Sequence, residues 1–340
     1  MEENRHINLI TGATSHLGIS IAKKLIEAGE EVRAIIPEKP AVSSEWKNLP
    51  PGVKPYVVNL TFKNDEDKKN LEEALEGVDR VFHFAGAVFN YKFTYNQFID
   101  INVIGTENLL RTAKEVNLRT GGQIHFLYSS SVTVYGYRRR GVVLTEDSEL
   151  KPASPYSESK VMAEQVIKSY CDAYPNMKYT IFRLATFFGD GYNAPIFKVF
   201  NLVKEGKMPI IGDGKNFLTF VNIEDIIEAF ILASSKNEAS SNKIYNLTDG
   251  VNHEMKALLD LAASLLNVKP PEKRVNFLLA NLARKVMDIN YDEFEFITSD
   301  RIISIDKIKK ELGFFPKKTL ENEASELVKE FLEKGKMLNS

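Results

Sequence analysis

Cysteine and tryptophan are almost missing from this sequence, whose 340 residues include one Cys, one Trp and five His. A lone thiol, Cys171, excludes an intramolecular disulfide and indicates a reducing, cytoplasmic environment. A tetrahedral zinc site needs several Cys or His ligands, and here they are few and scattered. We therefore expect neither a disulfide scaffold nor a bound metal.

The sequence also lacks an excess of charge of one sign and long hydrophobic runs. The 44 Lys and Arg residues nearly balance 46 Asp and Glu, for a formal net charge of -2, so no overall field attracts nucleic acid or an anionic membrane. No apolar run approaches the about 20 residues that cross a bilayer, and the first residues lack a secretory signal pattern. We expect a cytoplasmic protein that binds a small molecule, without nucleic-acid or membrane partners.

Short apolar segments alternate with amphipathic stretches in the first half of the chain. Strand-like segments lie at 7–10, 31–36, 56–60, 79–86, 123–130 and 179–185. Apolar strands that alternate with helices predict an α/β fold of the Rossmann type, with a doubly wound parallel sheet covered on both faces. We expect residues 1–190 to form this dinucleotide-binding domain, with segments near 217–248 returning to it, and residues 191–340 to form a smaller, interwoven substrate lobe.

The segment TGATSHLG, residues 11–18, lies between the first strand and the first helix. In such a turn the first glycine allows a tight bend, the middle one lets the backbone approach a pyrophosphate, and the last lets helix and strand pack closely. Gly12 and Gly18 fill the outer positions, but Ser15 replaces the middle glycine. Its side chain can crowd the phosphates or donate to them, and the segment alone also fits an ordinary turn.

The end of the second strand bears on the choice of cofactor. The fold expects an acidic residue there to hold the ribose hydroxyls, whereas this strand ends in Ile36 and Pro37, followed by Glu38 and Lys39. Without the acid a 2'-phosphate is not repelled, and Lys39, with Arg33 further off, can attract one. This favours NADP over NAD, although both charges also fit solvated surface positions.

The segment SPYSESK, residues 154–160, indicates proton transfer. Ser154 suits an N-cap and Pro155 the first helical position, which puts Tyr156 and Lys160 four residues apart on one helix face. A tyrosine hydroxyl ordinarily has a pKa of about 10, and a neighbouring ammonium favours its ionised form. The pair could exchange a proton with a carbonyl or alcohol oxygen while hydride moves at the adjacent carbon.

Three consecutive serines, Ser129 to Ser131, end the fifth predicted strand. The carboxyl ends of parallel strands border the ligand crevice of an open sheet. A hydroxyl there can orient a substrate oxygen, or it can cap a helix or stabilise a loop.

These segments together resemble the extended short-chain dehydrogenase/reductase family, also named the NAD-dependent epimerase/dehydratase family. TGATSHLG resembles the family's TGxxGxxG, VFHFAG its HxAG, NVIGT its NVxGT, and SSSVTVYG followed by YSESK its serine and YxxxK. Later segments, FRLATFFGDG, GDGKNFLTFVNIED and DKIKKELGFFPK, resemble family elements in the same order. The similarity covers nearly the whole chain.

The resemblance implies roles for individual residues. Tyr156 is the implied acid/base, Lys160 lowers its pKa and binds the nicotinamide ribose, Asn102 supports the site, and Ser131, which precedes Tyr156 by 25 positions, orients the substrate oxygen. The implied cofactor-binding residues, besides Tyr156 and Lys160, are Gly12, Thr14, Ser15, His16, Leu17, Gly18, Lys39, Asn59, Leu60, Phe84, Ala85 and Gly86. The implied substrate-binding residues are Val88, Phe89, Ser131, Thr133, Tyr156, Thr186 and Phe187. The family's two-helix interface, on helices near 102–116 and 155–173, implies a homodimer.

Departures from the family pattern discriminate among its activities. The family's dehydratases carry acids after the catalytic hydroxyl, where this chain has Val132 and Thr133. Many of its enzymes for nucleotide-sugars carry an arginine where this chain has Leu218, so a pyrophosphate would lack its bidentate partner. The run Arg138–Arg140 could replace it, or could belong to a solvated loop.

Aromatic residues are frequent in the predicted substrate loops, which favours an apolar substrate. We therefore expect an NAD(P)-dependent oxidoreductase that interconverts a carbonyl and a secondary alcohol on a moderately apolar small molecule. One alternative is a nucleotide-sugar epimerase with tightly bound NAD. Another is a non-catalytic NAD(P)-sensing protein, a class that often loses the tyrosine or lysine present here.

Overall fold

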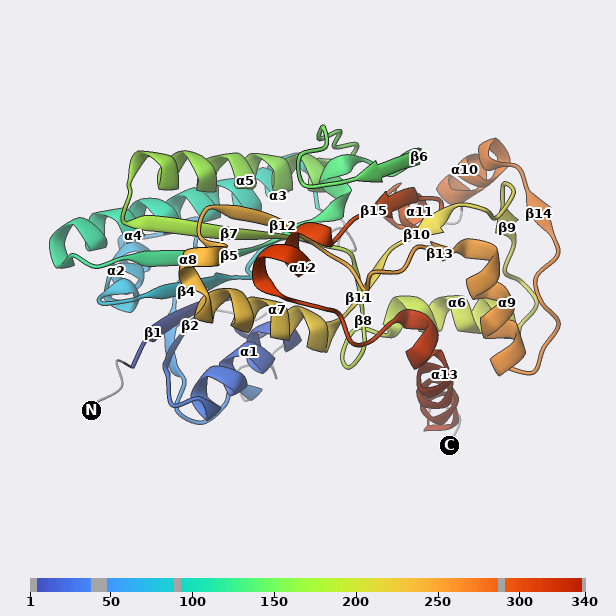
Figure 1. Ribbon diagram of the computed structural model, residues 1–340, viewed down its shortest axis with the longest axis horizontal. Helices are drawn as coiled ribbons and strands as arrows, with labels where there is room; N and C mark the ends of the chain where they lie inside the picture. The colour runs from blue at the N-terminus through green and yellow to red at the C-terminus, as the bar shows by residue number, and fades with distance from the viewer. Residues whose placement is uncertain (1–4, 38–47, 89–92, 287–290, 338–340) are drawn as a thin grey trace.

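The computed structural model describes residues 5–37, 48–88, 93–286 and 291–337, and two predicted site residues, Lys39 and Phe89, lie outside these ranges. A seven-stranded sheet with strand order β12-β7-β5-β4-β1-β2-β3 forms the centre of the larger part of the molecule (Figure 1). Every pair of neighbouring strands in it is parallel. This confirms the predicted Rossmann-type sheet. Its strands are β1 (Ile7–Thr11), β2 (Glu31–Ile36), β3 (Lys54–Val57), β4 (Arg80–His83), β5 (Ile124–Ser131), β7 (Met177–Leu184) and β12 (Lys243–Leu247).

Helices cover both faces of this sheet (Figure 1). One face is covered by α1 (His16–Glu27), α7 (Ile223–Ser235) and α12 (Asp306–Leu312), with the short α8 (Asn237–Ser240) after α7. The other is covered by α2 (Asp65–Leu75), α4 (Gly105–Thr120) and α5 (Pro155–Ala173). The chain enters α4 through α3 (Tyr95–Ile99) and the π-helical turn η2 (Asp100–Ile104).

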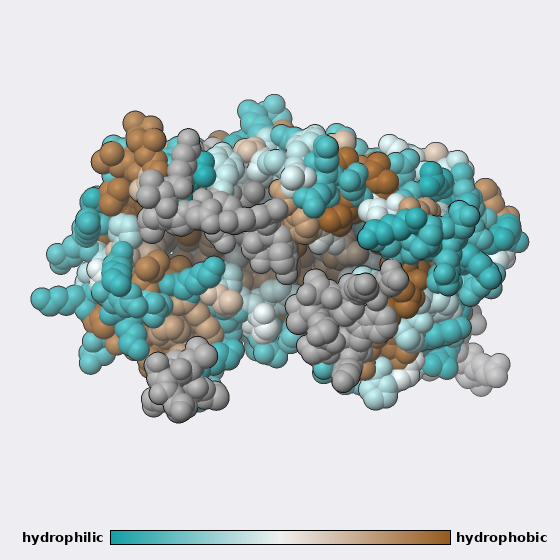
Figure 2. Space-filling model, turned by 180° about the vertical axis from the view of Figure 1, so that it is seen from behind, coloured by the Kyte–Doolittle hydropathy of each residue, from teal (hydrophilic) through white to brown (hydrophobic). Residues whose placement is uncertain are grey.

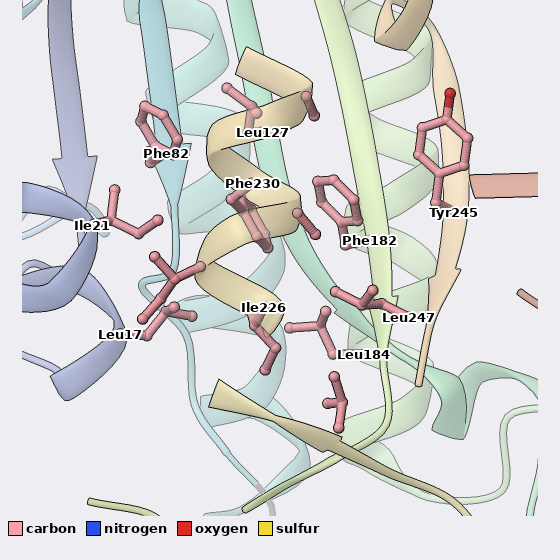
Figure 3. Close-up of a cluster of buried hydrophobic side chains, with 14 of the residues drawn as sticks. Leu17, Ile21, Phe82, Leu127, Phe182, Leu184, Ile226, Phe230, Tyr245 and Leu247 are labelled. Carbon is pink, nitrogen blue, oxygen red and sulfur yellow. The ribbon is translucent and has the colours of Figure 1, made fainter. Parts of the chain in front are cut away.

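The core under α1 and α7 follows from the helical spacing of apolar residues. Leu17 and Ile21 on α1, and Ile226 and Phe230 on α7, recur at four-residue intervals and face the sheet (Figure 3). The Phe230 ring packs on Phe182 of β7, with 4.4 Å between ring centres. This packing holds α7 against β7, and the buried residues of α1 belong to the same core. No helix among the described residues is long and apolar enough to span a membrane.

The smaller part of the molecule lies at the right-hand end of Figure 1. Its helices α6 (Ala194–Lys204), α9 (Met255–Leu265) and α13 (Leu320–Met337) share a separate apolar core, and α10 (Phe277–Val286) and α11 (Tyr291–Ile297) lie beside them. Short strands pair outside the central sheet: β8 (Thr186–Phe188) with β11 (Phe220–Asn222), β9 (Ile210–Ile211) with β14 (Arg274–Val275), and β10 (Phe217–Leu218) with β13 (His253–Glu254).

Two local predictions differ from the structure. Strand β3 ends at Val57, earlier than the expected 56–60 segment, because Val58 to Leu60 already turn toward α2. The arginine run is not a solvated loop, since it opens β6 (Arg138–Leu144), which pairs with the distant β15 (Asp300–Ile303). That pairing partner lies far away in sequence, so no local pattern announces the strand.

Candidate active site

The glycine turn after β1 leaves no room for a side chain. Gly12 has a φ of +67°, and a Cβ atom there would lie 2.7 Å from the backbone nitrogen of Ala85. A Cβ atom on Gly18 would lie 2.5 Å from the carbonyl oxygen of Gly12. Because the atoms met are backbone atoms, only glycine fits at either position. The turn brings the chain close to the start of α1, as a pyrophosphate-binding turn requires.

Ser15 is the N-cap residue of α1. Its hydroxyl accepts a hydrogen bond from the backbone nitrogen of Gly18 over 3.1 Å and donates one to the carbonyl oxygen of Gly12 over 2.8 Å. The hydroxyl is thus used inside the turn, where it stabilises the start of the helix. Thr14, just before it, is half-buried.

His16 and Leu17 begin α1 and point in different directions. The Leu17 side chain is buried in the core, so only its backbone can face a ligand. The His16 ring lies 5.9 Å from the Tyr192 ring, and its Nε2 lies 3.8 Å from an Asp190 carboxylate oxygen. The loop after β8 therefore lies against the N-terminal end of α1.

The residues after β3 form a loop at the same edge of the sheet. The Asn59 side-chain oxygen accepts hydrogen bonds from the backbone and hydroxyl of Thr61, over 3.0 and 2.7 Å. The Leu60 carbonyl oxygen accepts one from Asn108 of α4 over 2.8 Å. The Asn59 oxygen is therefore used by its own loop.

The residues after β4 lie between the glycine turn and α5. The Phe84 ring packs on Phe230, 5.0 Å between centres, so its side chain belongs to the core. Ala85 donates its backbone N–H to the Thr11 hydroxyl. A Cβ atom on Gly86 would lie 3.0 Å from the Asn102 side-chain oxygen and 3.6 Å from Lys160 Nζ. Because Gly86 has no side chain, its backbone lies close to both Asn102 and Lys160.

A hydrogen-bond chain through His83 connects the turn with η2. The Ala85 N–H donates to Thr11 Oγ1, which lies 2.6 Å from His83 Nδ1. On the other side, His83 Nε2 lies 2.8 Å from Thr106 Oγ1, and that hydroxyl donates to the Asn102 carbonyl oxygen. These donors and acceptors are all satisfied only when the proton is on Nε2. Burial, with Lys160 nearby, lowers the pKa of His83 to about 3, so the ring is neutral.

Asn102 lies on the π-helical turn η2 and is buried. Its side-chain oxygen accepts the Ala87 N–H over 2.6 Å, and its side-chain nitrogen donates to the Ala87 carbonyl and to Ser159 Oγ, over 3.2 and 2.8 Å. Asn102 therefore joins the end of β4 to α5. Single π-helical turns inside helices occur frequently at functional sites.

Tyr156 and Lys160 lie one turn apart on α5, which begins with the predicted Ser154 cap and a proline at its start. Both side chains are buried. Lys160 Nζ donates to the Ser129 carbonyl oxygen over 2.9 Å and to the Tyr128 hydroxyl over 3.3 Å, and lies 5.9 Å from the centre of the Tyr156 ring. Burial lowers the pKa of Lys160 to about 8, an effect that the Glu164 carboxylate opposes.

The three serines at the end of β5 have different partners. Ser129 donates to a carbonyl oxygen of β4, and Ser130 donates to the buried Glu164 carboxylate over 2.5 Å. The Ser131 hydroxyl instead accepts hydrogen bonds from the backbone and the side chain of Thr133, over 3.2 and 2.9 Å. Its own proton has no acceptor among the described residues, so Ser131 is the serine that can donate to a substrate oxygen.

The implied substrate residues that the structure describes follow β4, end or follow β5, or lie on β8 and α5. Ser131 pairs in register with Leu184, and Thr186 follows two residues later. The Phe187 ring contacts Tyr192, 5.2 Å between centres. Val88, after β4, is 39% exposed.

Arg139 and Arg140 of β6 already have partners. Arg139 donates to the carbonyl oxygens of Tyr135 and Glu149, and Arg140 lies 3.1 Å from a carboxylate oxygen of both Asp213 and Asp300. Two carboxylates neutralise Arg140, which argues against a role in binding a substrate anion. The Arg138 side chain lies outside the described residues.

Sequence reasoning missed Arg301, a buried residue of β15. It donates to the carbonyl oxygens of Val132 and Gly136, over 3.2 and 3.4 Å, at the two ends of the turn η3 (Val132–Tyr135) that follows Ser131. Burial lowers the pKa of Arg301 to about 10. No sequence signal pairs residue 301 with residues 132 and 136, because only the β6–β15 pairing brings them together.

The structure does not bring Arg33 to the cofactor region. Its guanidinium pairs with Glu31 over 2.9 Å and donates to the carbonyl oxygens of Ala74 and Glu76 at the end of α2. Of the two cations considered for a 2'-phosphate, Arg33 is therefore occupied, and Lys39 lies outside the described residues.

Curated relatives are similar to this chain in sequence. The chain is 28% identical over 245 residues to the N-acetyl-alpha-D-glucosaminyl-diphospho-ditrans,octacis-undecaprenol 4-epimerase of Escherichia coli O157:H7, covering 72% of each chain. It is 26% identical over 288 residues to the UDP-glucose 4-epimerase of Lactobacillus helveticus, covering 77% of this chain and 82% of that one.

Solved structures agree on the fold. The UDP-glucose 4-epimerase of Thermotoga maritima, solved with UDP-glucose, superposes with a TM-score of 0.74 at 22% identity, over 97% of this chain and 99% of that one. A sequence profile of the NAD dependent epimerase/dehydratase family matches residues 8–248. The chain therefore belongs to the NAD-dependent epimerase/dehydratase family, and is an enzyme of the extended short-chain dehydrogenase/reductase type.

Proposed function

We propose that this enzyme is an NAD-dependent sugar epimerase, which oxidises a secondary hydroxyl of a sugar ring and reduces the resulting carbonyl from the opposite face. The observation that carries the proposal is the buried Lys160 beside the Tyr156 ring, at the edge of the sheet where Ser131 keeps a hydroxyl proton to donate. The sequence patterns alone favour a carbonyl reductase and leave an epimerase as the alternative. The similarity to two 4-epimerases favours the second.

The residues of this chain divide the proton chemistry among them. Tyr156 takes up the proton of the sugar hydroxyl during oxidation and returns it during reduction, while the Lys160 charge favours the ionised phenol. Ser131 donates to the same substrate oxygen and holds it in place. When bound at this site, NAD would supply the hydride acceptor for oxidation of the sugar carbon and the hydride donor for its reduction. Because Val132 and Thr133 follow Ser131 where dehydratases have acids, this chain lacks the acid/base pair for loss of water.

The residues present fit a dinucleotide. The tight turn at Gly12 and Gly18, at the start of α1, would hold the pyrophosphate, and the backbone of Gly86 beside Lys160 would border the nicotinamide ribose. With Arg33 bound to α2, we propose NAD in place of NADP. A UDP-glucuronic acid 4-epimerase of the same fold was solved in complex with NAD.

We further propose that the substrate is a sugar joined to a diphosphate, since the names of the two curated relatives both describe such sugars. Thr133, Thr186 and Phe187 would border it. We also propose that the chain divides into two lobes near residue 190. We propose further that it forms a homodimer through α4 and α5.

The test begins with purified protein that is denatured to identify any released nucleotide. Protein loaded with NAD is then incubated with UDP-glucose or UDP-N-acetylglucosamine, and the configuration of the sugar is followed by NMR. We expect the 4-epimer to accumulate without net formation of NADH, and Tyr156→Phe to abolish this conversion while NAD affinity stays within about threefold.

A different pattern would support the reductase. Stoichiometric consumption of NADPH with a carbonyl compound, and no epimer from either sugar, would overturn the epimerase proposal. Substantial turnover by Tyr156→Phe would overturn the role of the tyrosine in either reaction.

A further inference from the structure

The turn η3, which follows Ser131, is held through its backbone carbonyl groups. Each carbonyl oxygen from Val132 to Gly136 accepts a hydrogen bond. The three inner ones accept, over 3.0, 2.9 and 3.1 Å, from the backbone of Gly136, the backbone of Lys151 and the side chain of Arg139. The two at the ends, on Val132 and Gly136, both accept from Nη1 of Arg301. A single side chain therefore ties the two ends of the turn together.

Arg301 is a charged side chain in the interior of the protein. Hydrophilic residues cover much of the surface in Figure 2, whereas Arg301 is 2% exposed. Glu295 and the Tyr137 ring, 5.2 Å from the guanidinium, favour its charged form. Its Nε–H, however, has no hydrogen-bond acceptor among the described residues. A buried charge with an unsatisfied donor costs free energy, and the hydrogen bonds to the two ends of the turn are the contacts that offset this cost.

The strand pairing is irregular at Arg301. Strands β6 and β15 lie side by side (Figure 1), but their register changes between Asp300, which pairs with Arg138, and Ile302, which pairs with Val143. Arg301 lies at this change. Irregularities in strand pairing redirect side chains, and they are frequent next to active sites. Here the side chain at the irregularity contacts the turn that follows β5, and not only its own strand partner.

The turn in its place holds the Ser131 hydroxyl. The backbone N–H and the hydroxyl of Thr133 both donate to Ser131 Oγ, over 3.2 and 2.9 Å. These two bonds use the oxygen as an acceptor and leave its proton for the substrate. A shift of Thr133 would therefore displace the hydroxyl that orients the substrate oxygen. Arg301 restrains Thr133 because it holds the residues at both ends of the turn.

We propose that Arg301 is a positioning residue for Ser131, so that a strand near the C-terminal end of the chain completes the catalytic site at the end of β5. The inference rests on the proposed function for the role of Ser131. That role is the same in a sugar epimerase and in a carbonyl reductase, because in both the serine orients the substrate oxygen. A misplacement of about 1 Å can lower a rate about 100-fold, so even a small relaxation of the turn should reduce turnover.

The test is a double-mutant cycle of Arg301→Lys and Ser131→Ala, with the substrate that the preceding assays identify. Lysine keeps the charge but lacks the planar fork that reaches both carbonyl groups. We expect Arg301→Lys to lower kcat about tenfold or more while KM stays within about threefold. In the Ser131→Ala background the same substitution should change kcat less than about twofold, because residues that act as a unit are not additive.

The matched control is Arg33→Lys. Arg33 also donates to two backbone carbonyl oxygens, those of Ala74 and Glu76, over 2.9 and 2.7 Å, but at the end of α2. Its substitution should leave kcat within about twofold of the unchanged protein. The melting temperature and the NAD affinity of each variant check that the fold is intact. If Arg301→Lys does not fold, Arg301→Gln takes its place, since an amide keeps hydrogen-bond donors without the charge.

Hydrogen exchange tests the hold on the turn without turnover. The N–H groups of Thr133 and Gly136 should exchange about tenfold faster in Arg301→Lys and at the unchanged rate in Arg33→Lys. Exchange in η3 that Arg301→Lys leaves unchanged would overturn the proposal, and so would an equal loss of kcat with and without the Ser131 hydroxyl. If neither sugar nor carbonyl compound is converted, the proposed function fails, and the exchange rates alone decide whether Arg301 holds the turn.

Discussion

The ammonium nitrogen of Lys160 lies 5.9 Å from the centre of the Tyr156 ring, one turn further along α5. Burial lowers the pKa of this ammonium to about 8, so the charge beside the phenol is present below that pH and lost above it. The charge that would stabilise an ionised Tyr156 is therefore lost at a pH at which the protein can be assayed.

We expect kcat/KM for sugar oxidation to fall as the pH rises through about 8, because deprotonated Lys160 no longer favours an ionised phenol. The measurement is a pH profile of the oxidation half-reaction with bound NAD. Lys160→Arg keeps its charge at every accessible pH and should remove this limb. If kcat/KM of Lys160→Arg still fell above this pH, the fall would be caused by the titration of another group.

Gly12→Ala is expected to disrupt the cofactor turn. A Cβ atom would meet the Ala85 backbone nitrogen at 2.7 Å, in addition to the cost of about 1–3 kcal/mol for a side chain at positive φ. Gly29→Ala is the matched control, because Gly29 also has positive φ but a Cβ atom there meets nothing within 4 Å. Calorimetric titration with NAD should show lost binding only for Gly12→Ala; retained affinity would contradict the assigned pyrophosphate-binding turn.

Ser15→Gly, which restores the family's usual glycine, should not tighten NAD binding appreciably. The serine hydroxyl is used within the turn by Gly12 and Gly18, so it does not obstruct the phosphates. Stability should fall by a few tenths of a kcal/mol in Ser15→Gly and by about 1 kcal/mol in Ser15→Ala. Denaturant unfolding and NAD titration measure both quantities, and a gain in affinity above tenfold for Ser15→Gly would show that the serine crowds the site.

Glu164→Gln should destabilise the fold by about 3–5 kcal/mol, since it leaves a buried arginine charge without its partner. Arg183 makes two hydrogen bonds to the Glu164 carboxylate, at 3.1 and 2.8 Å, and both side chains are almost fully buried. The exposed pair of Lys329 and Glu326 gives the control, because Glu326→Gln should change the free energy of unfolding by less than about 1 kcal/mol. Equal decreases in the free energy of urea unfolding for Glu164→Gln and Glu326→Gln would contradict the prediction that the buried pair contributes more.

The stability contributed by His253 should decrease as the pH rises above the ordinary histidine range. Burial acts to lower the pKa of His253, but the Asp249 carboxylate at 2.7 Å, together with Glu321, raises it overall. A raised pKa in the folded state stabilises the fold below the pKa of about 6.5 of the unfolded chain, and that contribution is lost as pH rises through the folded value. Urea unfolding of the unchanged protein and of His253→Gln should therefore differ most at low pH; a constant difference from pH 6 to 9 would contradict the linkage.

The parts that the sequence predicts well are those that local chemistry decides. Ser154 caps α5 and Pro155 opens it as expected, because both preferences depend only on the helix start. The order of βα units in the central sheet is likewise visible in short apolar runs. The spacing typical of the family selects Ser131 among the three serines. The structure adds a physical reason, because the hydroxyl protons of Ser129 and Ser130 are already donated to protein acceptors.

What the sequence could not reveal depends on distant pairing. Strand β6 exists because β15, more than a hundred residues later, lies beside it. Arg301 reaches the turn after Ser131 for the same reason, and Arg33 looked available until its contacts with the end of α2 were visible. Periodicity reports which face of an element is buried, but not which neighbour buries it.

The chain from Thr11 through His83 and Thr106 to Asn102 contains no group that carries charge above about pH 3. It therefore keeps a constant length between the glycine turn and Asn102, which is hydrogen-bonded to Ser159 of α5. Acidification or alkalinisation within the range of a living cell changes the charge of Lys160 and leaves this spacing untouched. If the proposed roles hold, a change of pH near 8 alters the charge beside Tyr156 without changing the distance between the glycine turn and α5.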